Sequence, residues 1–344
     1  MLACALHEIG RLVCGEVPDP VPAAGEALLK IKASGVCGSD IPRVFSKGTY
    51  KFPTVPGHEF AGEIVRVGDG VDGSLVGKAA AVFPLLPCRS CEMCEAGEYA
   101  LCRDYDYFGS RRDGGFAEYA SVPLWNLVFC DGLSYEELAM AEPAAVSVHA
   151  LGRAGVSLGD VVAIFGAGAI GLMLAAFTRA SGAGETVLFD IDEKRLDFAK
   201  KNGYAHAYDC SGDGWRRAFS ELTGGRGADI VVEGAGVSAS VENCLKAAKP
   251  LGKVVLMGNP SGGVSLRQEH YWEILRKQLT IYGTWNSDYS RTKNDWKTAV
   301  SAMASGAVDL KPLVTHRFPL SECAEAFEFV RDRTNFSCRV MFVD

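Results

Sequence analysis

The feature that most constrains the fold is a glycine-rich turn between an apolar run and a helical stretch. Residues 161–165 are apolar, and Gly166, Gly168 and Gly171 follow in the spacing G-x-G-x-x-G. In such a motif the first glycine makes a tight turn, the second lets the backbone approach a pyrophosphate, and the third allows close helix–sheet packing. Asp190, nineteen residues further on, can accept hydrogen bonds from ribose hydroxyls and repel a 2′-phosphate. The pattern predicts a dinucleotide site that prefers NAD.

The surroundings of this turn predict a parallel sheet. From about residue 147, strand-like runs alternate with helical stretches, which is typical of a doubly wound Rossmann domain. Ile170 and Arg195 are further candidates for cofactor contacts; the alternative is a turn that binds no ligand. The expected strands cover 161–165, 186–190, 229–233, 253–257 and 279–283, and the expected helices cover 172–179, 194–202, 215–222 and 239–247.

The two ends of the chain follow a different pattern. Residues 1–146 are rich in glycine, proline and short β-branched runs, which predicts a mainly β domain with strands over 27–33, 62–68 and 78–83. Residues 287–344 contain two amphipathic stretches, 295–305 and 321–331, and a closing strand over 337–343. We therefore expect an α/β protein with a first domain over 1–146, a nucleotide domain over 147–286, and a return to the first domain over 287–344.

Four cysteines crowd into fifteen residues. Cys88, Cys91, Cys94 and Cys102 have the spacing C-x2-C-x2-C-x7-C. Four thiolates can surround one tetrahedral Zn²⁺ and leave no open position, so the spacing predicts a structural zinc lobe over about 85–105. An iron–sulfur cluster is the chemical alternative, but its bacterial motif has a shorter last gap followed by proline, where this chain has Arg103. Free or oxidised thiols are the remaining alternative.

Composition excludes several classes of protein. The chain has 344 residues and a net charge of −7, which disfavours nucleic acid and anionic membranes as partners. Residues 161–178 are uncharged, but their strand–turn–helix order argues against a membrane span. Residues 1–8 lack the pattern of an export signal, so we expect a cytoplasmic, reducing location. There, the seven cysteines outside the proposed metal sites are expected to be small buried hydrophobes.

A second set of metal-binding residue types is spread along the first domain. Cys37 lies after an expected strand, His58 and Glu59 lie on a turn, and Glu142 precedes a proline where a helix can begin. Cysteine, histidine and glutamate together can form an open zinc site. Residue type and spacing alone leave the alternative open, because an acid is also common in the first turn of a helix.

Taken together, these motifs resemble the zinc-dependent medium-chain dehydrogenases of the alcohol and sorbitol dehydrogenase superfamily. The matching segments occur in the family's order along the whole chain: Gly35–Asp40, Gly57–Glu59, the four-cysteine lobe, Glu142-Pro143, and the glycine motif with Asp190. The segments 84–88, 108–119 and 283–286 resemble the family's polyol-phosphate branch. The resemblance implies a GroES-like catalytic domain beside the Rossmann domain, and an assembly of two or four identical chains.

The resemblance also implies a mechanism. A catalytic zinc is expected on Cys37, His58 and Glu142, with Glu59 close by and a fourth position open, so the chain would hold two Zn²⁺ and use NAD. Zinc would polarise a substrate hydroxyl and hydride would pass to the nicotinamide. Ser39 matches the family's proton relay. Many relatives continue that relay with a histidine where this chain has Pro42, which puts the exit route for the proton in doubt.

The implied substrate is a small polyol or polyol phosphate. The resemblance favours galactitol 1-phosphate and tagatose 6-phosphate as the reacting pair, with a free polyol such as sorbitol or xylitol as the alternative. A phosphate requires cationic groups, for which Arg43, Lys47, Lys51, Arg111 and Arg112 are candidates. A catalytically silent cofactor-binding protein of the same fold is the more distant alternative; such a protein would be expected to have lost a zinc ligand.

Overall fold

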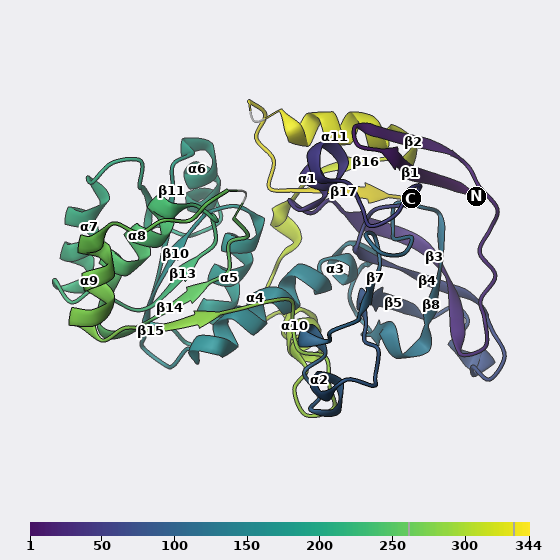
Figure 1. Ribbon diagram of the computed structural model, residues 1–344, viewed down its shortest axis with the longest axis horizontal. Helices are drawn as coiled ribbons and strands as arrows, with labels where there is room; N and C mark the ends of the chain where they lie inside the picture. The colour runs from purple at the N-terminus through teal and green to yellow at the C-terminus, as the bar shows by residue number, and fades with distance from the viewer. Residues whose placement is uncertain (261, 333) are drawn as a thin grey trace. The chain divides into compact units, whose positions relative to one another are not determined.

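The computed structural model describes residues 1–260, 262–332 and 334–344. The chain forms two compact units, shown in Figure 1. Met1–Ala145 and Asp288–Asp344 make the first unit, and Val146–Ser287 make the second. The chain therefore leaves the first unit once and returns to it, and the second unit is an insertion in sequence.

The second unit is a six-stranded parallel sheet flanked by helices on both faces (Figure 1). The strand order is β12-β11-β10-β13-β14-β15, so it reverses between β10 and β13. In open α/β sheets a ligand crevice forms at the carboxyl end of such a reversal. The strands are β10 (Val161–Phe165), β11 (Glu185–Asp190), β12 (Ala207–Asp209), β13 (Ala228–Glu233), β14 (Ala248–Leu256) and β15 (Thr280–Gly283).

The helices of this unit lie close to the expected ranges, with one addition. They are α5 (Ala169–Ala180), α6 (Glu193–Lys201), α7 (Trp215–Thr223), α8 (Ser238–Ala247) and α9 (Gln268–Lys277). In the core of this unit, the ring centroids of Phe165 and Phe189 are 4.4 Å apart and the rings stack, and Trp215 packs edge-on against both. Strand β12 and helix α9 were not expected from the sequence. The strand is only three residues long, too short for an alternating pattern, and α9 leaves Tyr271, Trp272 and Leu275 exposed, so its apolar residues do not mark a buried face.

The first unit is built on a seven-stranded sheet. Its order is β16-β17-β3-β4-β5-β9, and β8 also pairs with β3. The strands are β3 (Glu26–Gly35), β4 (Glu59–Val67), β5 (Ala79–Val82), β8 (Tyr119–Pro123), β9 (Leu127–Phe129), β16 (Val314–Phe318) and β17 (Arg339–Val343). Because β17 pairs antiparallel with β3, the last strand of the chain lies beside one of the first.

Smaller elements surround this sheet. The hairpin β1 (Leu2–Glu8) and β2 (Arg11–Glu16) and the pair β6 (Leu85–Leu86) and β7 (Asp106–Tyr107) form two further sheets. The helices are α1 (Asp40–Pro42), α2 (Glu92–Glu95), α3 (Tyr135–Ala139), α4 (Ala141–Ala154), α10 (Asp295–Ala304) and α11 (Cys323–Arg331). Helix α4 contains the point at which the chain passes from one unit to the other.

Two of the scattered cysteines differ from expectation. Cys4 and Cys14 form a disulfide across the hairpin, where free thiols were expected. The antiparallel register of β1 and β2 places the two residues directly opposite each other, and sequence spacing alone does not reveal that register. Of the others, Cys244 and Cys323 are buried as expected, whereas Cys130, Cys210 and Cys338 are only half-buried.

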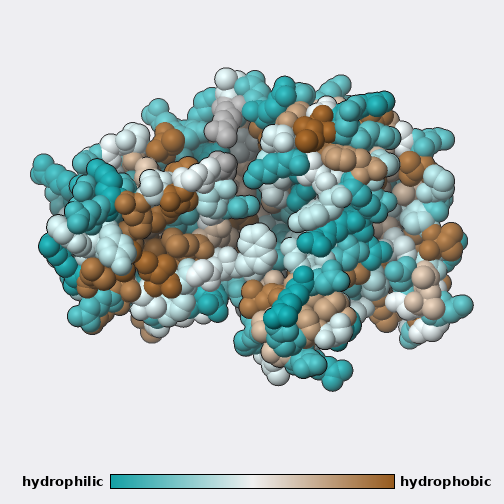
Figure 2. Space-filling view, viewed as in Figure 1, coloured by the Kyte–Doolittle hydropathy of each residue, from teal (hydrophilic) through white to brown (hydrophobic). Residues whose placement is uncertain are grey.

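Among the described residues, no helix is long and apolar enough to cross a membrane. The uncharged stretch 161–178 is divided between β10, the glycine turn and α5. On the face drawn in Figure 2, apolar side chains are interspersed with polar ones on both units.

Candidate active site and metal centres

The first candidate centre is assembled by strand pairing. Gly35, at the end of β3, is paired with Glu59, at the start of β4. Cys37 follows the first of these residues and His58 precedes the second, so the pairing brings both side chains to one place. The ligand atoms of Cys37, His58 and Glu59 lie within 4.8 Å of one another. A thiolate, an imidazole and a carboxylate are suitable ligands for zinc.

A buried carboxylate organises this centre. Asp40 is fully buried, accepts a hydrogen bond from the backbone N–H of Cys37 at 3.0 Å, and lies 3.6 Å from Nδ1 of His58. Burial by itself lowers the pKa of His58, but Asp40 and Cys37 outweigh it and hold that pKa well above its usual value. Burial likewise raises the pKa of the Cys37 thiol, yet the facing imidazole leaves it lowered. The raised pKa of His58 and the lowered pKa of Cys37 indicate a thiolate and an imidazolium that stabilise each other's charge.

Glu142 borders this centre but is not part of the closest group. It lies in the first turn of α4, is buried, and its Oε1 accepts a hydrogen bond from the Tyr107 hydroxyl at 3.4 Å. Burial raises the pKa of Glu142, while His58 and Tyr107 act in the opposite direction. The ring of Tyr107 lies 5.8 Å from that of His58. A metal held by Cys37 and His58 would therefore have Glu59 and Glu142 as neighbouring acids.

Glu59 already has a cationic partner. Arg339, at the start of β17, forms a buried ion pair with it, and Nη1 donates to Oε1 at 3.4 Å. Arg339 was not among the site residues predicted from the sequence. A signal was present in the sequence, since this arginine begins an otherwise apolar strand. A charged side chain is rarely buried unless it is paired, so a buried acidic partner could have been expected. This pair favours Glu142, rather than Glu59, as the carboxylate free to reach a metal.

The expected proton relay begins close to Cys37. The Ser39 hydroxyl lies 3.3 Å from Sγ of Cys37, and Ser39 is exposed. Pro42, at the end of α1, has no side-chain group that can carry a proton onward. A proton leaving through Ser39 would therefore pass to a group other than Pro42 or to solvent.

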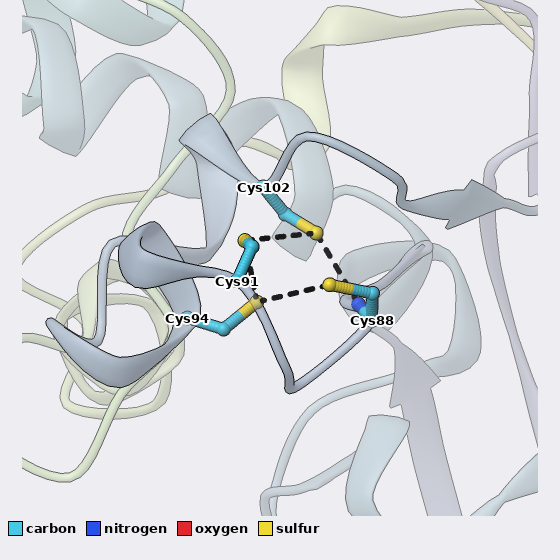
Figure 3. A group of neighbouring side chains, drawn as sticks. All are labelled: Cys88, Cys91, Cys94 and Cys102. Carbon is cyan, nitrogen blue, oxygen red and sulfur yellow. Dashed lines mark hydrogen bonds between the residues drawn. The ribbon is translucent and has the colours of Figure 1, made fainter.

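The second candidate centre is the four-cysteine lobe (Figure 3). The thiols of Cys88, Cys91, Cys94 and Cys102 turn toward one another, and three of the Sγ–Sγ separations are 3.6, 3.9 and 4.0 Å. Zn–S bonds of about 2.3 Å in a tetrahedron place the sulfurs about 3.8 Å apart. The four residues therefore fit a closed zinc site.

The lobe is joined to a cluster of aromatic side chains. Tyr99 packs edge-on against Trp125 at 5.4 Å, and Trp125 and Tyr289 pack at 5.0 Å. An ion pair between Lys293 and Glu98 adds a polar contact at 2.5 Å. These contacts attach the lobe to the segment before α10, which is part of the same unit.

The candidate dinucleotide site lies at the carboxyl end of β10. Gly166 has a φ of +111°, and a Cβ at Gly171 would lie 1.8 Å from the Gly166 carbonyl oxygen, so the two positions require glycine. Gly168 is the N-cap of α5, whose first turn includes Ile170. The turn and the helix thus have the form that accepts a pyrophosphate.

Asp190 supports this turn in a way that the sequence did not predict. Its buried carboxylate accepts hydrogen bonds from the backbone N–H groups of Ala167, Ile191 and Asp192 at 2.8, 2.8 and 3.0 Å. Nη1 of Arg195 lies 3.5 Å from the same carboxylate. Asp190 therefore fixes the glycine turn, and Arg195 places a cation beside its carboxylate.

The candidate phosphate contacts differ in their surroundings. Arg43 is paired with buried Asp40, and Lys47 and Lys51 are exposed. Arg112 lies 3.8 Å from Asp106. The Arg111 guanidinium lies over the rings of Tyr50 and Tyr105.

Comparison with known proteins identifies the family. The model of the alcohol dehydrogenase GroES-like domain matches residues 23–131, and that of the zinc-binding dehydrogenase domain matches residues 169–305. Galactitol 1-phosphate 5-dehydrogenase of Escherichia coli (strain K12) is 37% identical over 94% of this chain and 93% of its own length. The chain belongs to the zinc-dependent medium-chain dehydrogenases. Sorbitol dehydrogenase of Bacillus subtilis (strain 168) is 33% identical over 99% of this dehydrogenase and 96% of the relative.

Solved structures agree with this assignment. The crystal structure of galactitol-1-phosphate dehydrogenase from Escherichia coli matches this dehydrogenase with a TM-score of 0.93 and 34% identity, covering both chains fully. Two other similar structures contain a nicotinamide cofactor. A zinc-binding dehydrogenase from Sinorhizobium meliloti 1021 is bound to NADP; its TM-score is 0.89 at 27% identity, and the match covers 100% of this chain and 99% of that one. A short chain alcohol dehydrogenase from E. coli CFT073 is complexed with NADH; its TM-score is 0.90 at 27% identity, with the same coverage of 100% and 99%. The GroES-like and Rossmann fold expected from the sequence is confirmed, and the chain is an oxidoreductase of this family.

Proposed function

We propose that this dehydrogenase interconverts a polyol phosphate and a ketose phosphate with NAD, with galactitol 1-phosphate and tagatose 6-phosphate as the reacting pair. The observation that carries the proposal is the convergence of Cys37 and His58 beside the buried acid Glu142, in a chain 37% identical to galactitol 1-phosphate 5-dehydrogenase. In this reading residues 1–146 and 287–344 form the catalytic domain, and residues 147–286 form the NAD-binding domain.

Two zinc ions per chain are part of the proposal. Cys37, His58 and Glu142 would hold the catalytic ion, and the four cysteines of the lobe would hold the structural one. When bound, the catalytic zinc supplies a Lewis acid for the substrate hydroxyl and NAD supplies the hydride acceptor. The Asp40 carboxylate, 3.6 Å from Nδ1 of His58, would help to orient that ring by its charge, as acids beside a metal-binding histidine commonly do.

The remaining roles fall to groups of this chain. Ser39, whose hydroxyl lies 3.3 Å from Cys37 Sγ, would take the proton of the substrate hydroxyl and pass it toward solvent. Gly166, Gly168, Ile170 and Gly171 would hold the pyrophosphate, and Asp190 with Arg195 would contact the ribose. The negative charge of Asp190 supports a preference for NAD over NADP.

A substrate screen tests the proposal. NADH formation would be followed by its absorbance with the purified enzyme, NAD, and matched pairs of free and phosphorylated alditols. We expect the highest kcat/KM for galactitol 1-phosphate and a weaker reaction with NADP. A higher kcat/KM for every free alditol would replace the proposed substrate with the second candidate, a free polyol dehydrogenase, which the similarity to sorbitol dehydrogenase supports.

We further propose that the chain assembles into a homodimer or homotetramer. Strand β15 is at the edge of its sheet, and Ile281 on it is 39% exposed. Tyr271, Trp272 and Leu275 of the neighbouring α9 are also exposed. An exposed edge strand with apolar neighbours favours pairing with a second chain.

The cytoplasmic location stays a prediction.

A further inference from the structure

We propose that Arg111 is the residue that recognises the substrate phosphate. This inference rests on the proposed polyol-phosphate substrate. The Cζ atom of Arg111 lies 4.3 Å from the ring centroid of Tyr50 and 4.6 Å from that of Tyr105. Aromatic faces hold a guanidinium plane in place and leave its edge, with its N–H donors, available. A planar, oriented fork of donors is the side chain best suited to bind phosphate at two oxygens.

The charge of Arg111 is not neutralised within the described part of the chain. No carboxylate there forms an ion pair with it, and its Nε is buried without a hydrogen-bond partner. By contrast, Arg43 is paired with Asp40, and Arg112 lies near Asp106. Because Nε is enclosed, an anion would meet the terminal N–H groups of Arg111, and it would complete the surroundings of Arg111 and not those of the other two arginines.

The backbone around Arg111 keeps this arrangement in place. The N–H of Arg111 donates to the Tyr107 carbonyl at 3.0 Å, and the N–H of Tyr50 donates to the Ser110 carbonyl at 3.4 Å. The arginine and the exposed ring above it are therefore tied to the same short turn. A preorganised donor needs less ordering when the ligand binds.

Arg111 also lies at a suitable place relative to the candidate zinc centre. The ring of Tyr107 lies 5.8 Å from that of His58 and 6.1 Å from that of Tyr105, which in turn contacts Arg111. Two tyrosine rings thus separate the arginine from the metal ligands. In galactitol 1-phosphate the phosphate is on C1 and the oxidised carbon is C5. The phosphate and the reacting hydroxyl therefore lie near opposite ends of an extended substrate, which requires a phosphate contact at a distance from the metal ligands.

The test compares kcat/KM for galactitol 1-phosphate and for galactitol in Arg111→Met and Arg111→Lys. We expect Arg111→Met to lose roughly 10- to 100-fold with the phosphorylated substrate, mainly through KM, because a charge-assisted contact is removed from substrate and transition state alike. Its activity on free galactitol should stay within about twofold of the wild type. Arg111→Lys keeps the charge without the planar fork and should lose less.

Arg331→Met is the matched control. Arg331 also lies over an aromatic ring, Phe45 at 4.5 Å, but is paired with Glu328 on the surface. The Arg331→Met substitution should leave the activities on galactitol 1-phosphate and on galactitol unchanged. As a binding readout, inorganic phosphate should inhibit the oxidation of galactitol 1-phosphate by the wild type competitively, and this inhibition should weaken in Arg111→Met. Zinc content and melting temperature of each variant show whether it is folded.

The outcomes separate the two proposals. If the wild type prefers phosphorylated substrates and Arg111→Met keeps that preference, Arg111 is not the phosphate contact and the proposed function stands. If the wild type shows no preference for phosphate, the proposed substrate is wrong, and the role given to Arg111 is wrong with it. Loss of both activities in a folded Arg111→Met would also contradict a role limited to phosphate.

Discussion

At the scale of single residues, two buried acids lie beside the same pair of metal-binding side chains. Glu59 is within reach of Cys37 and His58 but is paired with Arg339, whereas Glu142 forms no ion pair in the described part of the chain and accepts a hydrogen bond from the Tyr107 hydroxyl. The different partners give the two acids different expected roles, although both are glutamates in one centre.

Glutamine substitutions separate these roles. We expect Glu142→Gln to lose one zinc per chain and most of the activity, with little change in melting temperature. Glu59→Gln should instead lower stability by about 3–5 kcal/mol, because it leaves Arg339 buried without a charge partner. Zinc analysis after dialysis and thermal unfolding measure the two effects, and Cys37→Ser provides a reference for loss of the catalytic ion. A Glu142→Gln variant that keeps both zincs would remove Glu142 from the ligands.

Asp190 has two roles that can be measured apart. Asp190→Ala should reduce the preference for NAD over NADP, because the charge that repels a 2′-phosphate is gone. It should also cost about 1–3 kcal/mol of stability, because three backbone N–H groups lose their acceptor. Asp190→Asn keeps an acceptor without the charge, so it should change the cofactor ratio with a smaller loss of stability. An unchanged NAD/NADP ratio in both variants would exclude Asp190 from ribose recognition.

At the scale of elements, the four-cysteine lobe has little regular structure apart from the four residues of α2 and a short 3-10 turn. Its order is therefore expected to depend on metal, as in other small zinc-bound loops. Cys102→Ser should lower the zinc content from two ions to one and make the segment near 88–102 sensitive to protease. Metal analysis and limited proteolysis check this. Iron in the purified wild type would favour the cluster alternative instead.

The contact between α8 and α9 should make the free energy of unfolding depend on pH in the acidic range. Glu242 is held by Arg267 and by His270, 3.2 Å away, and hydrogen bonds from Arg267 lower the pKa of Glu242 to about 2. An unperturbed glutamate has a pKa of about 4.3. Because the folded-state pKa is the lower one, the contribution is present above about pH 4.3 and is lost as the pH falls toward 2.

Glu242→Gln tests this dependence. The variant should melt at a lower temperature than the wild type at neutral pH, and the difference should shrink as the pH falls from about 4.3 toward 2, the interval between the two pKa values. Glu221→Gln is the control, since its pair with Arg217 is exposed on both sides and contributes little. A difference that does not change with pH would contradict an electrostatic origin.

At the scale of the whole molecule, the edge strand β15 is the clearest candidate for assembly. Ile281→Lys places a charge on that edge, and charged side chains there oppose strand pairing. We expect the wild type to elute as an oligomer in size-exclusion chromatography with light scattering, and the variant to shift toward the monomer. Leu158→Lys, at a position that is 89% exposed, is the control. A wild type that is monomeric at every concentration would refute the proposed assembly.

The sequence predicted the nucleotide domain better than the first one. Each of its long strands is an apolar run next to a helix, and the observed β10 and α5 follow from residues close together in the chain. The centre around Cys37 depends instead on the pairing of β3 with β4 and β17. Local patterns identified its ligand types, but they contained no information on register or on the strand that closes the chain.

Sites whose parts are neighbours in the chain could be predicted from the sequence. Four thiols within fifteen residues and a glycine turn between a strand and a helix have few alternative arrangements, because short connecting segments limit where their side chains can go. The pairing of Arg339 with Glu59, 280 positions away, and the position of Arg111 over Tyr50 are seen only in the folded chain. Such contacts arise from long-range strand pairing and loop packing, which depend on the burial of the whole sheet and not on any local motif.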